Sequence, residues 1–466
     1  MKYFIPDWDD RVDPNYDFKK DVHSKEHDED PRHDVYAHEI FGEVPYDGIL
    51  VSRMTLEISK KKYAHVRKMG IRAYLRLPAC YPIMGDCGAW GYVKEREPPF
   101  KTKEMLEYYA KCGFDLGVSI DHLVVPPYEE DRYFRYEITR KNAREMYDLW
   151  DKHYREKMRI IGVAQGWDVE SYRNAIRELL EIGYEYVALG GVAKMPTAHL
   201  IELLKEVSPI IKDKSKKENK KINFHVFGIA RKDILKTFYE CGVTSFDSAS
   251  FLRQAWLSAK ENYHTKERNY TAIRVRSESD KEGLLLRMLE DYSRGNISLK
   301  KVLLWMKENV SKSEKLIKEY ERTLTSKPWE KCECEICKNI GVNVIIFKGN
   351  NRNRRRGFHN TWVWYRMFRE KVPKCAFLFS YDIKEGFKDK EHFNIFKRVI
   401  DSPFDVGYVE EGKMVILGEG EVEPRRYSEF FVIGDLVLEG VKLRKISHES
   451  EVEDFLKEIK ERIRAC

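Results

Sequence analysis

The sequence predicts an α/β protein built on a (β/α)8 barrel of the TIM type, with a zinc-binding subdomain and a small C-terminal α+β domain. Between residues 47 and 255, short apolar runs rich in β-branched residues alternate with longer amphipathic stretches, which is the pattern of repeated βα units. Three cysteines and a histidine with the spacing of a metal site follow this region. From residue 375 to 466 the pattern changes to strand-like runs and one charged helix.

The N-terminal segment, residues 1–46, is expected to be irregular and is rich in His and Asp. Its histidines (His23, His27, His33 and His38) have unrelated spacings, which favours a surface loop over a metal site. The barrel core, residues 47–255, should then supply eight strands. We expect them at residues 48–52, 72–76, 83–86, 116–121, 160–165, 186–190, 222–228 and 244–247.

Amphipathic helices are expected between these strands. One runs from Asp168, whose carboxylate can cap the first turn, to Ile182, and another runs from Ala198 to Val207. Eight strands with helices between them favour a closed barrel. In such a barrel the chemistry gathers at the C-terminal ends of the strands.

Two further regions follow the barrel. Residues 256–374 are expected to be helical and to contain the metal site, with an apolar face at Val302–Met306 and an aromatic stripe at Thr361–Phe368. Residues 375–466 are expected to form an α+β domain, and the sequence does not indicate its role. Its elements should be strands at 375–379, 413–417 and 429–433 and a helix at 451–464.

Composition limits the class of protein. A chain of 466 residues buries a core without disulfides, and the cysteines outside the metal motif are scattered, which favours a reducing cytoplasm. No secretory signal opens the sequence and no apolar run reaches membrane-spanning length, so we expect a cytoplasmic protein without membrane contact. Lys and Arg (84) barely exceed Asp and Glu (77), so any affinity for nucleic acid must come from local clusters.

The most specific motif is the run from Cys332 through Cys334 to Cys337, together with His359. Three thiolates and an imidazole complete a tetrahedral shell, so we expect one Zn²⁺ per chain. Because protein would occupy all four positions, the ion should stabilise the fold and not activate water. Redox-active or simply buried thiols are the alternative interpretation.

A cationic run lies between the third cysteine and His359 and is expected to be a loop. A cationic loop fixed by a metal favours contact with the phosphates of a nucleic acid. On charge alone, a solvated surface loop is the alternative. The candidate phosphate ligands are Arg352, Arg354, Arg355 and Arg356.

Carboxylate and amide side chains end four of the predicted strands. A single Asp after a strand is most often a turn or capping residue, but four such groups at one mouth of a barrel are expected when several loops build one site. Glycines at two more strand ends would let backbone approach a planar ligand closely. The polar residues are Asp86, Asp121, Gln165 and Asp247, and the glycines are Gly190, Gly191 and Gly228.

Taken in order, these motifs resemble the tRNA-guanine transglycosylase family over about residues 45–370. Three segments are more similar to the DpdA branch, which is implicated in placing 7-deazaguanines in DNA: Ser119–Leu123, Phe246–Ser250 and Gly349–His359. No PUA-type RNA-binding module is recognised at the C-terminus. The motifs are Gly85-Asp86-Cys87-Gly88-Ala89-Trp90, Ser119-Ile-Asp121, Val163–Gly166, Gly190–Ala193, Phe227-Gly228, Ser245–Ser248 and the Cys3His set.

The resemblance implies an enzyme that exchanges guanine in DNA for a 7-deazaguanine base of the preQ0 type through a covalent aspartyl-glycosyl intermediate. It implies Asp247 as the nucleophile at C1′ and Asp86 as the general acid and base. Asp121 would accept hydrogen bonds from the N1 and N2 edge of the base, while Gln165 and the Gly191 amide would donate to its O6.

The resemblance also bears on partners. The target nucleotide must be single-stranded or flipped out of a duplex, and Arg253 would hold a flanking phosphate together with the arginine run. A homodimer is expected. Accessory proteins are plausible for opening DNA, because the sequence has no Gly-Lys-Thr phosphate-binding loop that could power unwinding.

Other functions remain open from the sequence. The enzyme could act on tRNA, or the chain could be a non-catalytic subunit that binds nucleic acid. The presence of both Asp86 and Asp247 argues against the latter. An unrelated metal-dependent barrel enzyme would need His122 and His225 as ligands, but a lone barrel histidine is more often a packed or hydrogen-bonding residue.

Overall fold

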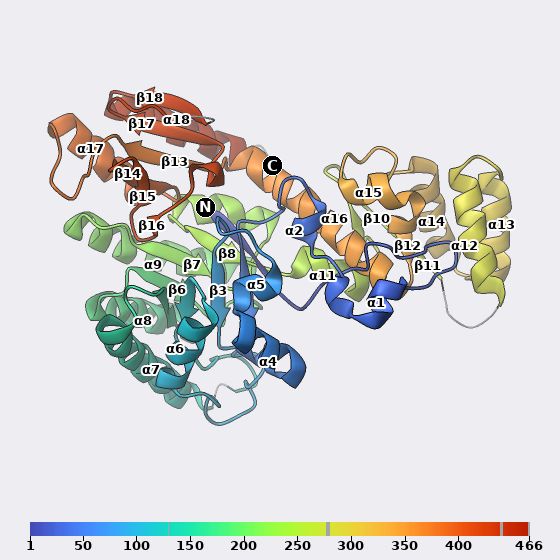
Figure 1. Ribbon diagram of the computed structural model, residues 1–466, viewed down its shortest axis with the longest axis horizontal. Helices are drawn as coiled ribbons and strands as arrows, with labels where there is room; N and C mark the ends of the chain where they lie inside the picture. Colours follow the sequence, from blue (N-terminus) through green and yellow to red (C-terminus); the bar gives the residue numbers. More distant parts are fainter. Residues whose placement is uncertain (129, 276–279, 439–440, 465–466) are drawn as a thin grey trace. The chain divides into compact units, whose positions relative to one another are not determined.

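The computed structural model describes residues 1–128, 130–275, 280–438 and 441–464 (Figure 1). Among these residues, no helix combines the length and the apolar composition that crossing a membrane requires. The chain divides into two compact units, each built from segments that are far apart in the sequence. The first comprises Met1–Trp8, Tyr46–Ser248 and Arg369–Cys466, and the second Asp9–Pro45 and Ala249–Phe368.

The first unit contains the predicted barrel, which is confirmed. Its parallel strands pair in sequence order, and β1 closes the sheet against β8, with Phe4 opposite Asp247. Apolar side chains such as Leu50, Met84 and Ile161 fill the interior. The strands are β1 (Lys2–Pro6), β2 (Gly48–Ser52), β3 (Ile83–Asp86), β4 (Leu116–Val118), β5 (Arg159–Ala164), β6 (Tyr186–Leu189), β7 (Asn223–Val226) and β8 (Ser245–Asp247).

The expected strand at residues 72–76 is wrong. That stretch forms most of helix α5 (Ile71–Leu75), whose buried side chains recur at the i, i+3 and i+4 spacing of a helix. The eighth strand is instead β1, which lies in the N-terminal segment expected to be irregular. Its apolar residues, Tyr3–Ile5, are consecutive and all buried, as in a parallel strand that is covered on both faces.

Helices surround the barrel, and α8 (Val169–Ile182) shows how the sequence places them. The Asp168 carboxylate accepts the Ser171 N–H over 2.8 Å, so the predicted cap is confirmed. The Asp168 N–H also donates to the Ser171 hydroxyl over 3.1 Å, which completes a capping box. The helix expected to end at Val207 continues to Glu218. The others are α3 (Arg53–Glu57), α4 (Lys60–Met69), α6 (Thr102–Cys112), α7 (Arg132–His153), α9 (Thr197–Glu218) and α10 (Leu235–Glu240).

The C-terminal part of the first unit is an α+β domain, and its predicted strands and last helix are confirmed. The sheet has the order β16-β15-β14-β13-β17-β18, and helices α17 (Lys390–Val399) and α18 (Glu449–Arg464) contact each other. The strands are β13 (Cys375–Phe379), β14 (Asp405–Glu410), β15 (Lys413–Ile416), β16 (Gly420–Glu421), β17 (Glu429–Ile433) and β18 (Lys442–Ile446).

This domain covers the end of the barrel at which the strands begin. Lys2 Nζ, at the start of β1, donates to Asp405 Oδ1 over 2.9 Å. Lys221 Nζ, just before β7, donates to the main-chain oxygen of Ser402 over 2.5 Å. The C-terminal ends of the strands are therefore the end of the barrel at which a site can form.

The second unit contains the metal motif, and the expected loop at residues 350–356 is wrong. These residues form the first turns of helix α16 (Gly349–Lys371), which also carries the predicted aromatic stripe. The other elements are α1 (Lys25–Glu29), α2 (Ala37–Ile40), α11 (Ser250–Leu257), α12 (Asp280–Ser293), α13 (Leu299–Asn309), α14 (Glu314–Ser326), α15 (Glu335–Ile340), β9 (Tyr263–His264), β10 (Asn269–Tyr270), β11 (Ile273–Arg274) and β12 (Ile346–Phe347).

Candidate active site and metal centre

Three carboxylates meet at the C-terminal mouth of the barrel. Asp86 ends β3, Asp247 ends β8 and Asp121 follows β4. Burial, then the negative charges of Asp121 and Asp247, raise the pKa of Asp86 to about 7, although the Gly88 N–H donates to its Oδ2 over 2.8 Å. Near neutral pH the Asp86 carboxyl is therefore divided between its two protonation states, as suits a group that both gives and takes a proton.

Asp121 and Gln165 are bonded to each other. Gln165 Nε2 donates to Asp121 Oδ2 over 2.6 Å, and the Cys87 thiol donates to Asp121 Oδ1 over 3.3 Å. The Tyr92 hydroxyl donates to the main-chain oxygen of Asp121 over 2.7 Å. Burial raises the pKa of Asp121, and these donors fix its orientation. The pair presents acceptor and donor atoms side by side, as recognition of a base edge requires.

The predicted glycines are needed for close packing inside the site. A Cβ on Gly190 would lie 2.3 Å from Gln165 Nε2, and one on Gly191 would lie 2.6 Å from Gln165 Oε1. Gly191 and Gly228 both have a φ of +74°, which favours glycine. The Gly228 N–H donates to Asp247 Oδ1 over 2.9 Å. The Gln165 side chain therefore already requires glycine at positions 190 and 191, and the backbone conformation favours it at 228.

A chain of hydrogen bonds through the barrel interior holds Asp247. His225 Nε2 lies 3.1 Å from Asp247 Oδ1, and His225 Nδ1 lies 2.8 Å from Ser245 Oγ. The Tyr186 hydroxyl lies 2.6 Å from the same Ser245 oxygen. Because a carboxylate only accepts, a neutral His225 donates from Nε2 and accepts the Ser245 O–H at Nδ1. The Ser245 oxygen then accepts from the Tyr186 hydroxyl. This order fixes the imidazole tautomer and orients Asp247.

His225, Cys87 and Tyr92 are site residues that the sequence did not select. His225 was expected to be a packed or hydrogen-bonding histidine, and its partner is a predicted site residue. The strand pattern carried a signal, because His225 pairs with Ser245 across β7 and β8, and Asp247 stands two residues further along, on the same face. Cys87 and Tyr92 follow Asp86 in a loop, where no helix or strand periodicity indicates which way a side chain points.

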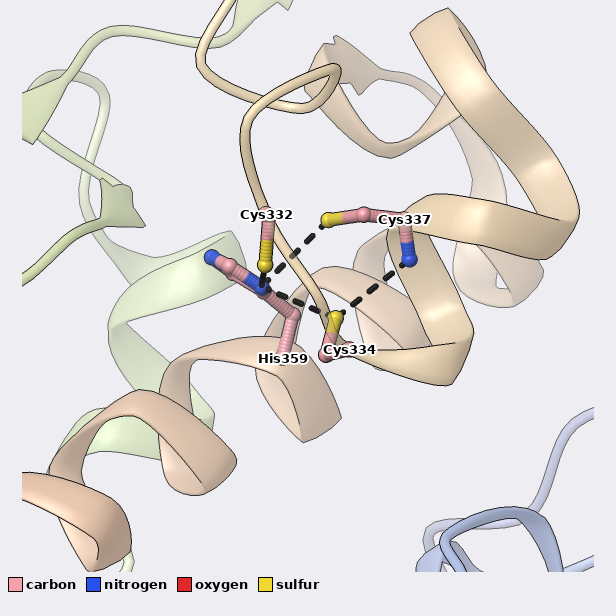
Figure 2. Close-up of side chains that lie close together, drawn as sticks. All are labelled: Cys332, Cys334, Cys337 and His359. Atoms are coloured by element: carbon pink, nitrogen blue, oxygen red, sulfur yellow. Dashed lines mark hydrogen bonds between the residues drawn. The ribbon is translucent and has the colours of Figure 1, made fainter.

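The four predicted metal ligands come together in the second unit, as Figure 2 shows. His359 Nδ1 lies 3.6, 3.4 and 3.5 Å from the sulfur atoms of Cys332, Cys334 and Cys337. A tetrahedral ion with bonds of about 2.3 Å to sulfur and about 2.0 Å to nitrogen would set these atoms roughly 3.5 Å apart. The donor set therefore fits a four-coordinate metal ion.

Neighbouring residues orient these ligands. Cys334 is the N-cap of α15 and Cys337 lies in its first turn, so an ion would join α15 to the His359 helix, α16. His359 Nε2 donates to the main-chain oxygen of His264 over 2.8 Å, which leaves Nδ1 as the ligand atom. The Tyr263 ring stacks on His359 with centroids 4.2 Å apart. With four protein ligands, a bound ion would have a structural role.

Three of the four arginines in the cationic run point into the second unit. Arg352, Arg355 and Arg356 are 1, 5 and 0 % exposed. Arg356 donates to the main-chain oxygens of Val344 (3.1 Å) and Ala255 (2.6 Å), and burial lowers the pKa of Arg356 to about 9. These internal bonds run against the expectation that the three side chains contact phosphates.

The same helix holds the N-terminal segment of the second unit. Arg352 pairs with the Asp21 carboxylate, and Arg354, which keeps partial exposure, donates to the main-chain oxygen of Arg11 over 2.9 Å. Arg253 lies on α11 and is half-buried. The cationic run therefore has a structural role that its charge alone did not indicate.

The fold and the two clusters together define a (β/α)8 barrel protein with an acidic mouth and a Cys3His cluster that could hold a metal ion. The family model described as queuine tRNA-ribosyltransferase (TGT) matches residues 92–370, and the chain belongs to this family. It is therefore a glycosyltransferase of the pentosyl-transferring type, and the resemblance seen in the sequence is confirmed.

Two curated relatives place the chain within the family. A DNA-guanine transglycosylase from Salmonella montevideo is 36% identical over 407 residues, which are 78% of this chain and 96% of that protein. A tRNA-guanine(15) transglycosylase from Pyrobaculum aerophilum is 27% identical over 179 residues, which are 37% of this chain and 34% of that protein. The long match supports the DpdA-like branch.

Proposed function

We propose that this chain exchanges guanine in DNA for a 7-deazaguanine base of the preQ0 type. The observation that carries the proposal is the similarity, over 78% of the chain, to a protein named DNA-guanine transglycosylase. The acidic mouth of the barrel supports it, because the proposed exchange needs one carboxylate to attack the sugar and another to move a proton.

Asp247 is the proposed nucleophile. Its attack on C1′ of the target nucleotide breaks the bond from C1′ to the base nitrogen and forms an aspartyl-glycosyl ester. His225 and the Gly228 amide both donate to Oδ1, so Oδ2 is the oxygen that attacks. In the second half-reaction the ring nitrogen of the incoming base attacks C1′ and releases the Asp247 carboxylate.

Asp86 is the proposed proton carrier. In its protonated form it gives a proton to the departing guanine, and as a carboxylate it then takes the proton from the incoming base. A pKa of about 7 makes both forms accessible at one pH. The cycle is balanced in protons and needs no redox cofactor.

Asp121 and Gln165 are proposed to bind the base. Asp121 accepts from the N1 and N2 edge, while Gln165 and the Gly191 amide donate to O6. Guanine and a 7-deazaguanine share this edge, so one pocket serves the departing and the incoming base. Because a duplex hides both this edge and C1′, the target nucleotide must be single-stranded or flipped out.

We further propose that the ion held by the Cys3His set is zinc, one per chain, since thiolate and imidazole donors in a tetrahedron suit zinc. Its role is to join α15 and α16, and base exchange does not use it. A partner that opens DNA, a homodimer and a cytoplasmic location stay predictions from the sequence.

The test is base exchange on defined polymers. The protein is incubated with a 7-deazaguanine and, separately, with single-stranded DNA, duplex DNA and tRNA, and the digested nucleosides are analysed by mass. We expect incorporation into DNA. Incorporation only into tRNA would favour the alternative function, to which the 27% identical relative points.

The covalent step has its own test. Wild-type protein and DNA should form an adduct that survives denaturant, and Asp247→Ala should form none. The matched control is Asp213→Ala, which removes an exposed carboxylate on α9 and should keep the adduct. No exchange on any polymer, with or without candidate strand-opening partners, would leave the non-catalytic binding subunit as the better interpretation.

A further inference from the structure

The burial of the α16 arginines leaves open which surface receives the nucleic-acid backbone. One segment of the first unit is strongly cationic. Between Glu57 and Asp86 the sequence contains no Asp or Glu, while it contains seven Lys and Arg residues: Lys60, Lys61, Lys62, Arg67, Lys68, Arg72 and Arg76. This segment forms helices α4 and α5 (Figure 1, blue) and connects β2 to β3.

Helix α4 presents four of its five Lys and Arg residues on one side. Lys60, Lys61, Arg67 and Lys68 are all exposed, and Ala64, which lies between them on the same face, is exposed as well. The opposite side is anchored by Val66, which is fully buried. From residue 60 to 68 the helix rises about 12 Å, which is between three and four times the roughly 3.4 Å that separates the phosphates of one strand along the axis of duplex DNA.

Among the described residues, carboxylates on the helices that contact α4 pair with cations outside this face. Two carboxylates on helices that contact α4, Glu57 of α3 and Glu104 of α6, both pair with the buried guanidinium of Arg53. The next carboxylate along α6, Glu107, lies 3.7 Å from Lys111 on its own helix. The positive potential of α4 is therefore directed toward solvent.

The segment begins at the mouth of the barrel. β2 ends at Ser52 and α3 follows at once. A Cβ on Gly88, two residues beyond Asp86, would lie 2.3 Å from Ser52 Oγ and 2.7 Å from Met54 Cβ, so the start of α3 packs against the loop that follows Asp86. A strand whose target nucleotide enters the mouth can therefore pass over α3 to α4.

We propose that the exposed face of α4, made of Lys60, Lys61, Ala64, Arg67 and Lys68, binds the phosphate backbone of the DNA substrate beside the target nucleotide. The proposal rests on the proposed function, since it names the contact that a DNA substrate of that site makes. Lysine and arginine contacts of this kind position a strand and carry no base specificity.

The test is the salt dependence of binding. The probe is a fluorescein-labelled single-stranded oligonucleotide, and affinity is measured by anisotropy from 50 to 300 mM salt. Each lost phosphate contact lowers the slope of log K against log salt by about 0.7 on single strands. Changing Lys60, Lys61, Arg67 and Lys68 to Ala should lower the slope by about 2 and weaken binding at 0.1 M salt by about 100-fold.

Two controls separate position from charge. The first removes four exposed cations from the C-terminal sheet, Lys413, Lys442, Arg444 and Lys445, with the same change in net charge, and should leave the slope unchanged. The second changes Lys60, Lys61 and Lys68 to Arg, which keeps the charge and should keep the slope. Thermal melts of each variant should match the wild type, because all these side chains are exposed.

The outcomes also separate this inference from the proposed function. With wild-type exchange activity present, the α4 variant should raise KM for the oligonucleotide while kcat at saturation is kept. An unchanged slope in the α4 variant, or an equal loss in the C-terminal control, would overturn the inference. Absence of base exchange by the wild type would instead count against the proposed function, whatever the slopes show.

Discussion

Asp86→Asn should stabilise the protein at neutral and alkaline pH while it slows base exchange. The reason is that burial and two neighbouring carboxylates raise the pKa of Asp86 from 3.8 to about 7. The folded protein therefore holds the Asp86 proton more tightly than the unfolded chain does. The contribution of Asp86 to the free energy of unfolding is therefore fully present below pH 3.8 and is lost as the pH rises through 7.

The size of the effect follows from the shift. One pKa unit corresponds to about 1.4 kcal/mol, so the ionisation of Asp86 in the folded state costs at most about 4 kcal/mol. Between pH 5.5 and 8 the free energy of unfolding of the wild type should fall by about 2 kcal/mol through this group. For a domain of this size, that fall corresponds to a decrease of roughly 4 °C in Tm. An asparagine cannot ionise, so the variant has no such loss.

Differential scanning calorimetry across this pH range measures the effect. The difference in Tm between Asp86→Asn and wild type should grow as the pH rises and level off above pH 8. Asp213→Asn, which changes an exposed carboxylate, should show no such growth. A difference that stays constant from pH 5.5 to 8 would refute the argument that the mouth of the barrel holds Asp86 partly protonated.

Three further predictions concern the other buried groups. His225→Phe should lower kcat about 10- to 100-fold with KM for DNA unchanged, because a hydrogen bond to a charged group is worth about 1.5–3 kcal/mol. His225→Gln, which can still donate to Asp247, should recover part of the loss. A kcat of the Phe variant equal to that of the wild type would contradict this prediction. Cys334→Ala should release the metal and lower the melting temperature of the second unit, and elemental analysis that finds no zinc in the wild type would remove the assignment. Arg352→Ala should destabilise the second unit by about 1.5–3 kcal/mol, because it removes a charge-assisted hydrogen bond to Asp21, which keeps Lys348 and Tyr16 as partners; unchanged stability in denaturant titration would show that the pair contributes little.

The barrel could be predicted because parallel strands that are buried on both faces read as short apolar runs, and because a helix such as α8 begins at a side chain that caps it. Asp168 and its partner Ser171 are visible in the sequence alone. The site residues at strand ends followed from the same logic, since the C-terminal ends of all the strands face one mouth. What local pattern could not supply was the pairing of β1 with β8, because this contact joins residues that are about 240 positions apart.

The error at residues 72–76 has a similar cause. A run of five residues is too short for its apolar pattern to distinguish a strand from one turn of a helix, and tertiary packing decides between them. Here Gly70, with a φ of +83°, ends α4 and begins α5, and the buried side chains of α5 then fall on one helical face. The predicted number of eight barrel strands was right, although β1 takes the place of the strand expected at residues 72–76.

The two cationic helices show what sequence can reveal about charge once the helical phase is known. On α16, Arg352, Arg355 and Arg356 stand seven, four and three residues before His359, so they share a face with a residue that must be buried to bind a metal. On α4, none of the exposed cations stands three, four or seven residues from Val66, the buried anchor. A cluster of positive charge on a helix therefore indicates a nucleic-acid surface only when the cations lie on the face opposite the buried side chains. The cations of α4 meet this criterion, and those in the first turns of α16 do not.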